Sequence, residues 1–286
     1  MNSTDFAFIA AFLKERSGLI ITSDKLYLLE TRLGTILREH ALAGLTALAD
    51  ALRQPGPSKL KDKVVDAMTT NETSFFRDTH PFDTLKKSLI PGLIERRAAA
   101  KTLRIWSAAC STGQEPYSLA MTLKDSFPVL GAWKVEIIAT DISPSVLDKA
   151  REGLYSQFEV QRGMPIQMLI RHFDQVEQNW RIKPELRQNI TFRSANLLDD
   201  FSLLGTFDII LCRNVLIYFD QPTKTRILNG MAKRMAPDGA LLLGGAESVF
   251  GLCDAFQNLP GVKGVYGHST GQPVKHAAPV RPAAVA

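Results

Sequence analysis

Residues 106–120, WSAACSTGQEPYSLA, decide the fold of this 286-residue chain. The apolar run 102–109 before the loop predicts a strand, and 115–127 predicts a helix. Small polar residues between a strand and a helix are typical of a nucleotide-binding loop. This loop has no lysine, however, and Glu115 at the helix start would repel phosphate. The stretch therefore favours a nucleoside with a cationic group; the alternative is a small-residue turn that only caps the helix.

Strands and helices alternate from residue 101 onward. Further strands are expected at 135–141, 189–195, 207–212 and 239–245, and further helices at 143–152 and 221–235. This alternation predicts an α/β fold with a doubly wound, mostly parallel sheet. Residues 154–188 interrupt the pattern, and 180–186 predicts a short strand in an inserted subdomain.

The N-terminal part predicts helices only, at 3–16, 23–40, 43–53 and 58–69. A stripe at spacings of three and four supports the second helix: Leu26, Leu29, Leu33, Ile36 and Leu37. The expected division is a helical domain over 1–85, a linker over 86–100, an α/β domain over 101–267 and a disordered tail over 268–286, which is rich in Pro and Ala.

The composition is that of an ordinary globular protein, with 45% hydrophobic and 22% charged residues. The net charge of +5 is spread along the chain, which does not indicate a nucleic-acid partner. Three separated cysteines fit a reducing cytoplasm. No apolar run approaches about 18 residues, so no membrane insertion is expected. The five histidines form no ligand cluster, so no metal site is expected.

Polar residues follow several expected strands. Asp141 ends the second strand, where an acidic residue commonly binds ribose hydroxyls, although it could instead cap the next helix. Asn196 and Leu197 follow the third strand, and Arg213 and Asn214 follow the fourth. Each pair alone is typical of an ordinary loop. Because the carboxyl ends of parallel strands lie together, we expect one shared pocket.

The segment 69–78, TTNETSFFRD, lies outside the expected sheet domain. Thr69 and Glu72 fit a helix capping box, and the two phenylalanines fit a plain core. Asn71, Thr73 and Arg77 are nevertheless grouped closely enough to close over a ligand.

Six ordered motifs resemble the chemotaxis receptor glutamate methyltransferases of bacteria: NETSFFRD, WSAACSTGQEPYSLA, ATDIS, ANLLD, CRNVLIYFD and APDGALLLGGAES. The resemblance runs from about residue 6 to 266. It implies a small all-α N-terminal domain and a Rossmann-like domain that binds S-adenosylmethionine and carries a small antiparallel β-subdomain. It also implies methyl transfer to glutamates on the cytoplasmic helical domain of chemoreceptors, with S-adenosylhomocysteine as product. A cytoplasmic monomer is expected.

The resemblance assigns cofactor contacts by position: Asn71, Thr73, Arg77, Glu115, Asp141, Asn196, Leu197, Arg213 and Asn214. Tyr218 matches the family tyrosine near the reactive sulfonium, so Arg77 and Tyr218 are the candidate catalytic residues. An accessible glutamate has a pKa of about 4.3 and is already a carboxylate at neutral pH, so no general base is required.

Two departures from the family pattern stand out. Gly245-Ala246-Glu247 replaces a common Gly-His-Ser-Glu, with no expected effect on the chemistry. Some members bind a receptor's C-terminal pentapeptide beside a glycine-containing loop of the β-subdomain. Here 174–179, DQVEQN, is short, lacks glycine and carries Asp174 and Glu177. The chain is therefore expected to work without that pentapeptide.

Other readings of the chain stay open. A nucleic-acid methyltransferase that acts on amino groups usually has Asn/Asp-Pro-Pro-aromatic after the fourth strand, where this chain has Arg-Asn-Val-Leu-Ile-Tyr. A regulatory or scaffold module could bind S-adenosylmethionine without turnover, although Arg77 and Tyr218 argue against it.

Lys25 and Arg32 on the helix 23–40 predict a basic face that docks acidic receptor helices; an ordinary solvated face is the alternative.

Overall fold

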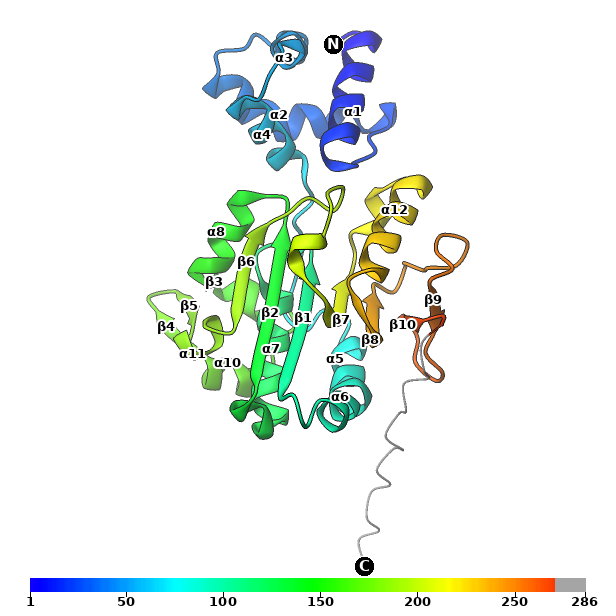
Figure 1. Ribbon diagram of the computed structural model, residues 1–286. Helices are drawn as coiled ribbons and strands as arrows, with labels where there is room; N and C mark the ends of the chain where they lie inside the picture. The colour runs from blue at the N-terminus through cyan, green and yellow to red at the C-terminus, as the bar shows by residue number, and fades with distance from the viewer. Residues whose placement is uncertain (271–286) are drawn as a thin grey trace, which may run out of the picture.

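The structure, a computed structural model, describes residues 1–270. A helical domain at the top of Figure 1 comprises α1 (Ser3–Ser17), a 3-10 turn (Ser23–Lys25), α2 (Leu26–Glu39), α3 (Leu45–Arg53) and α4 (Lys59–Met68). The predicted stripe on α2 supplies its core, because Leu29 and Leu33 are fully buried and Ile36 nearly so. Leu26 and Leu37 pack partly buried at its margin.

The second domain is built on a seven-stranded sheet in the order β6-β2-β1-β7-β8-β10-β9. The strands that run parallel are β1 (Thr102–Ala108), β2 (Lys134–Asp141), β6 (Ile190–Ser194), β7 (Phe207–Cys212) and β8 (Met235–Leu243). From central β1 the chain moves outward to β2 and β6, then returns to β7 on the other side of β1. The predicted doubly wound α/β fold is confirmed, with its switch point between β1 and β7.

Alternate residues of the strands supply the cores on the two sheet faces. In β7, Ile209 and Leu211 face one core, and Ile210 and Cys212 face the other. The helices and short helical turns after the parallel strands are α7 (Gln114–Ser126), a 3-10 turn (Pro128–Ala132), α8 (Pro144–Glu152), a 3-10 turn (Ser202–Leu204), η5 (Leu216–Tyr218) and α12 (Gln221–Ala232). Apolar runs buried on both faces explain why these strands read as continuous hydrophobic stretches.

Residues 69–79 cross from the helical domain to the sheet domain, and we call them the strap. They lead into α5 (His80–Thr84), a π-helix (Leu85–Leu89) and α6 (Ile90–Arg96). The range 86–100, predicted as a linker, thus lies largely in helix. Leu89, Ile90 and Leu93 are buried in the same core as Ile105 and Ile209. That apolar spacing packs the segment against the sheet.

The insert after α8 forms a separate three-stranded antiparallel sheet in the order β3-β5-β4. Its elements are β3 (Leu154–Ser156), α9 (Gln157–Gln161), α10 (Ile166–His172), β4 (Phe173–Val176), β5 (Asn179–Ile182) and the following α11 (Pro184–Arg187). Between β4 and β5 the chain turns through residues 177–178, and Glu177 has a φ of 55°. The sequence DQVEQN is thus the end of a tight hairpin.

The sheet ends with β9 (Phe256–Asn258) and β10 (Val265–His268), which pair antiparallel beside β8. His268 stacks on Phe256 with ring centroids 6.1 Å apart, so it belongs to the sheet. The remainder of the predicted disordered tail, from 271 on, lies outside the described residues. Across residues 1–270, none of the helices combines the length and apolarity needed to cross a membrane.

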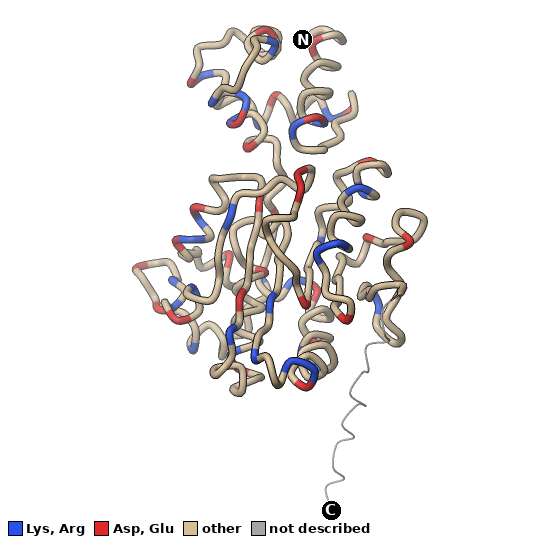
Figure 2. The backbone as a smooth tube through the Cα atoms, viewed as in Figure 1, with Lys and Arg blue, Asp and Glu red and all other residues tan. Residues whose placement is uncertain are grey.

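The positions of basic and acidic residues are interspersed along the backbone of both domains in Figure 2. The described part of the chain shows no long single-signed stripe in that view. This arrangement agrees with a charge that is only mildly basic and widely spread.

Candidate functional site

A pocket lies where the strap crosses the carboxyl ends of β1, β2 and β7. Its empty volume, counted together with the open solvent at its mouth, is ≈ 890 Å³. Seven of the predicted site residues line it: Asn71, Thr73, Arg77, Glu115, Asp141, Arg213 and Asn214. Tyr218 lines it as well. The fold thus brings together residues that are up to 147 positions apart in sequence.

Asp141 ends β2 with its carboxylate held by backbone amides. The N–H groups of Ser111 and Ser143 donate to its two oxygens at 2.8 and 3.0 Å. Burial raises the pKa of Asp141 more than these hydrogen bonds lower it. Ser143, rather than Asp141, caps α8, because its hydroxyl accepts from the N–H of Val146. The fixed Asp141 oxygens keep lone pairs that can accept hydrogen bonds from sugar hydroxyls.

Asn196 and Leu197 line a smaller pocket that continues the first one. The two pockets share lining residues, and the smaller one adds Ala195, Asn196 and Leu197. Leu197 is 9% exposed and belongs to the core. The Asn196 amide donates to the carbonyl of Arg16 at 2.7 Å and accepts from the N–H of Leu198 at 3.0 Å. This end of the site is apolar and narrow, which suits a flat heterocycle.

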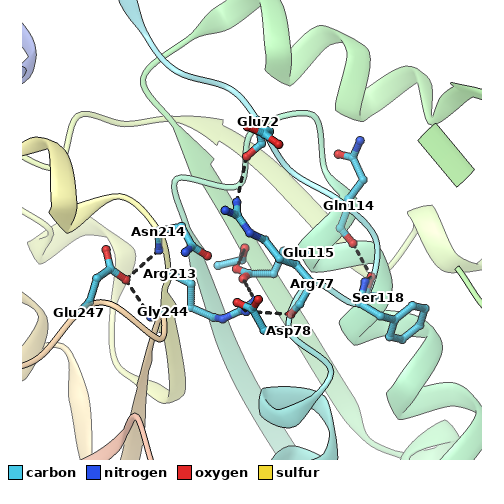
Figure 3. A network of polar contacts seen from close by, with 12 residues as sticks. Glu72, Arg77, Asp78, Gln114, Glu115, Ser118, Arg213, Asn214, Gly244 and Glu247 are labelled. Carbon is cyan, nitrogen blue, oxygen red and sulfur yellow. Dashed lines mark hydrogen bonds and ion pairs between the residues drawn. The ribbon is translucent and has the colours of Figure 1, made fainter. Parts of the chain in front are cut away.

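Glu115 and Arg213 form the charged floor of the larger pocket (Figure 3). Glu115 accepts from Arg213 at 2.9 Å and from the hydroxyl of Ser107 at 2.8 Å. Arg213 also donates to the carbonyl of Arg77 and to the carboxylate of Asp78, at 2.8 and 2.9 Å. The two predicted cofactor residues therefore first bind each other, and Arg213 links the sheet to the strap.

The strap carries Asn71, Thr73 and Arg77 in an extended, irregular conformation. No helix begins at Thr69, so the capping-box alternative is wrong; Thr69 instead follows the end of α4. Phe75 is fully buried, as expected for a core residue. Arg77 donates to the carbonyl of Glu72 at 3.1 Å and reaches into the pocket lining. Its side chain thus lies beside Glu115 and Asp78 in Figure 3.

Glu247 organises the loop after β7, a role that sequence reasoning missed. Its carboxylate accepts hydrogen bonds of 2.7–2.9 Å from the backbone N–H groups of Asn214, Val215, Leu216 and Gly244. This holds Asn214 at a φ of 58°. The motif GGAES was noted as a departure from the family pattern, yet it retains this glutamate. No local pattern announces these contacts, because three of the four donors lie 31–33 residues earlier in the chain.

Arg32 on α2 binds the end of α4, and the docking of receptor helices by this face stays a prediction. Its guanidinium donates to the carbonyls of Met68 and Thr69 at 2.8 and 2.9 Å and to the Thr70 hydroxyl at 3.1 Å. These are carbonyls left unpaired at the end of α4. The guanidinium keeps its charge there, since all three partners are neutral.

The helical domain contacts the sheet domain close to this pocket. Asp66 on α4 accepts hydrogen bonds from the hydroxyls of Ser143 and Ser145. Lys14 pairs with Asp220 at 2.8 Å, and the N–H of Ile20 donates to the carbonyl of Tyr218 at 3.2 Å. Both candidate catalytic residues thus lie at the junction of the domains.

Two further chemistries receive no support from the described residues. Burial raises the pKa of the Cys110 thiol well above its usual value, which disfavours a thiolate nucleophile. Within residues 1–270, no group of three or more His, Cys, Asp or Glu side chains could hold a metal ion.

The donor set fits S-adenosylmethionine. Asp141 suits ribose hydroxyls, and the narrow end around Leu197 suits adenine. Arg77, Arg213 and Glu115 offer both charges to an amino-acid group that carries a carboxylate and an ammonium. Neither lining contains a lysine among the described residues, so the set provides no phosphate clamp of that kind.

Both parts of the chain match models of one protein family. Residues 4–69 match "CheR methyltransferase, all-alpha domain", and residues 71–265 match "CheR methyltransferase, SAM binding domain". The change between the two models coincides with the start of the strap.

Curated relatives match over nearly the whole chain. "Chemotaxis protein methyltransferase 1" of Pseudomonas aeruginosa is 42% identical over 260 residues, which is 89% of this chain and 94% of that protein. "Chemotaxis protein methyltransferase Cher2" of Pseudomonas putida is 41% identical over 258 residues, 88% and 93% of the two chains. "Chemotaxis protein methyltransferase 1" of Vibrio cholerae is 40% identical over 261 residues, 90% and 94% of the two chains.

Proposed function

The chain belongs to the CheR methyltransferase family, and from this premise we propose that it methylates glutamate side chains of bacterial chemoreceptors. It is a chemotaxis methyltransferase that uses S-adenosylmethionine. The product of each transfer would be a glutamate methyl ester, with S-adenosylhomocysteine released. The observation that carries the proposal is that Arg77 and Tyr218 line one pocket with the sheet-end cofactor residues.

The reaction needs alignment rather than proton transfer. S-adenosylmethionine supplies a methyl group that is activated on a sulfonium. A glutamate carboxylate is ionised at neutral pH, so its oxygen can form the new O–CH3 bond as the S–CH3 bond breaks. Correct orientation alone can contribute ~7–11 kcal/mol to such a step. The chain's own task is therefore to hold the acceptor carboxylate in line and to exclude water.

We assign the orienting role to Arg77 and a packing role to Tyr218. The guanidinium remains charged at physiological pH, and among residues 1–270 it makes one hydrogen bond, to the carbonyl of Glu72. Other donors on Arg77 are free to meet an acceptor carboxylate. Tyr218 presents an aromatic ring, and such a ring attracts a cation such as a sulfonium. Asn71, Thr73, Glu115, Asp141, Asn196, Leu197, Arg213 and Asn214 are assigned to the cofactor.

The partner we propose is the cytoplasmic helical domain of a chemoreceptor, which the chain would reach as a monomer in the cytoplasm. The tight β4–β5 hairpin supports an approach that does not use a receptor's C-terminal pentapeptide. The turn residue Glu177 adds a negative charge beside that strand pair, whereas Asp174 is paired with Lys183 at 4.0 Å. The charge of Glu177 would oppose a carboxylate-terminated peptide.

Methyl transfer from labelled S-adenosylmethionine to three acceptors tests the proposal. Receptor cytoplasmic fragments should be labelled, whereas duplex DNA and RNA should remain unlabelled. Label on nucleic acid would contradict the proposal in favour of a nucleic-acid methyltransferase. Binding without label on any acceptor would indicate a scaffold module.

Arg77→Ala is the informative variant in the same assay. We expect kcat for the receptor fragment to fall by about 100-fold, the order of loss caused by misplaced reacting groups. The affinity for S-adenosylhomocysteine should change much less. Equal losses in both quantities would make Arg77 only a cofactor ligand.

A further inference from the structure

The strap is held by arginines from three different parts of the molecule. Arg32 of α2 binds its start, through the carbonyls of Met68 and Thr69 and the hydroxyl of Thr70. Arg162, which follows α9 in the β-subdomain insert, binds the Glu72 carboxylate at 2.8 Å. Arg213 of the sheet binds the end of the strap at the Arg77 carbonyl, at 2.8 Å.

The insert also touches the strap backbone directly. Gly163 has a φ of +89°, and a Cβ built on it would lie 2.2 Å from the carbonyl oxygen of Phe75. Only glycine permits an approach this close. Arg162 and Gly163 thus form one contact, through which the insert supports the middle of the strap.

The sheet domain adds neutral hydrogen bonds at two further points. The Ser111 hydroxyl donates to the carbonyl of Asn71 at 2.7 Å, and the Ser118 hydroxyl accepts from the N–H of Phe76 at 2.9 Å. Figure 3 shows Ser118 on α7, where its hydroxyl also donates to the carbonyl of Gln114. Each of the side chains that face the cofactor pocket therefore lies within a few residues of an anchor.

The strap needs such anchors because its backbone is strained. Phe76, Asp78 and Thr79 have φ values of 49°, 66° and 38°. Left-handed backbone is costly for residues other than glycine, and it persists only where the surroundings determine it. Removal of an anchor should let this segment relax and carry Arg77 away from the pocket.

We propose that Arg32 and Arg162 are positioning residues for the cofactor pocket. Neither lines the pocket; both act through the strap, by fixing where Asn71, Thr73 and Arg77 stand. Because one arginine belongs to the helical domain and the other to the insert, the cofactor site is assembled only when both units are seated. The inference uses the cofactor of the proposed function but does not depend on its acceptor.

Calorimetric titration with S-adenosylhomocysteine tests the role of Arg32. Arg32→Ala removes charged donors from the carbonyls at the end of α4 and should weaken affinity roughly tenfold or more. Arg32→Lys should lose less, since one ammonium can still reach a carbonyl. Arg38→Ala is the matched control on the same helix. Among the described hydrogen bonds, the Arg38 side chain has one, to the Thr35 hydroxyl, so affinity should not change.

Hydrogen exchange of the cofactor-free protein gives a second readout. Peptides that cover 69–79 should exchange faster in Arg32→Ala than in wild type or in Arg38→Ala, while peptides from β1 and β7 stay unchanged. A merely structural arginine would instead lower the melting temperature and leave affinity per folded molecule as it was.

Arg162 is tested by a double-mutant cycle with Glu72, because the pair is exposed and its loss does not threaten the fold. Arg162→Ala should weaken S-adenosylhomocysteine binding about two- to fivefold, because an exposed ion pair contributes little free energy. In a Glu72→Gln background the same change should have little further effect. Arg151→Ala, which breaks the exposed pair with Asp148, serves as control.

Two results would overturn the proposal. If folded Arg32→Ala binds S-adenosylhomocysteine within twofold of the wild-type affinity, Arg32 has no positioning role. If Arg32→Ala does not fold, Arg32→Lys and the Arg162 cycle decide; equal effects of Arg162→Ala in both backgrounds would show that Arg162 does not act through Glu72. Neither result bears on whether the acceptor is glutamate, since no acceptor is present.

Discussion

Glu115 and Arg213 lie 2.9 Å apart, Oε2 to Nη1, and join the first turn of α7 to the residue after β7. Their side chains are only 13% and 2% exposed. A charge pair so far removed from water depends on both partners, because loss of one leaves the other without compensation. The pair therefore contributes to stability and to the cofactor pocket together.

Glu115→Ala should lower the free energy of unfolding by about 2–3 kcal/mol, the range of a lost charged hydrogen bond in a buried setting. The loss is limited because Arg213 keeps Asp78 and the Arg77 carbonyl as partners. Affinity for S-adenosylhomocysteine should fall as well. Urea denaturation and calorimetry measure the two effects.

Glu185→Ala is the matched control for that variant. Glu185 forms an exposed pair with Lys124, so its loss should cost below about 1 kcal/mol and leave cofactor affinity intact. Equal stability of Glu115→Ala and Glu185→Ala would show that the buried pair is no stronger than a surface contact.

The affinity for the cofactor should fall at low pH, and this acid limb of the pH profile should come from protonation of Asp141. Burial raises the pKa of Asp141 above 3.8, and only the ionised carboxylate accepts from ribose without a competing proton. Affinity should therefore rise as the pH increases through the raised pKa. In Asp141→Asn this limb should vanish, with affinity at neutral pH about tenfold lower, because an amide cannot accept from both Ser111 and Ser143.

The stability contribution of Asp141 runs in the opposite direction. A carboxyl whose pKa is raised on folding contributes stability below its unfolded pKa and loses it as the pH rises through the folded value. Relative to Asp141→Asn, wild type should thus lose stability on leaving acid. Calorimetric affinities and urea midpoints across pH, from the same preparations, separate the two effects; parallel curves for both variants would refute them.

Glu247→Ala should loosen the loop that carries Asn214 and Tyr218. Four backbone N–H groups lose their acceptor, and we expect a loss of about 1.5–3 kcal/mol in unfolding free energy. Glu247→Gln should be intermediate, since one amide oxygen can still accept. Thermal unfolding and hydrogen exchange over 213–219 report the change, and unchanged exchange in the alanine variant would disprove this role.

The β-subdomain should not bind peptides from chemoreceptor C-termini tightly. The turn between β4 and β5 contains no glycine, and it carries Glu177, with Asp174 nearby on β4. Without tethering, methylation of receptor fragments should depend on their concentration in solution. Titration with such pentapeptides measures this directly, and low-micromolar affinity for one of them would contradict the expectation.

The fold could be predicted from sequence where apolar runs are uninterrupted. Residues 207–212 form β7 as predicted, because every residue of that run is buried. By contrast, β8 begins at Met235 rather than at 239, since its first residues pair with β7 across a register shift that no periodicity reveals. The short strands β9 and β10 were not predicted for a similar reason: three or four residues cannot establish an alternation.

The candidate site was predictable as a set of residues at strand ends, but the contacts that hold these residues in place were not. Asp141 and Arg213 could be selected because parallel strands end at one edge. Glu247 and Arg162 act by contacts to distant segments, and side chains of this kind leave no spacing in the sequence. The contact of Arg32 with the end of α4 was missed, because a cation on a helix looks solvated until the neighbouring helix end is known.

The bond that holds the transferred methyl group tests the central claim most directly. Receptor fragments should be methylated with labelled S-adenosylmethionine, exposed to alkali, and assayed for volatile label. A glutamate methyl ester is hydrolysed by alkali to methanol, so nearly all label should become volatile, and fragments with glutamine at the acceptor positions should take up none. Label that stays on the protein after alkali would contradict the account, because it would place the methyl group on nitrogen or carbon.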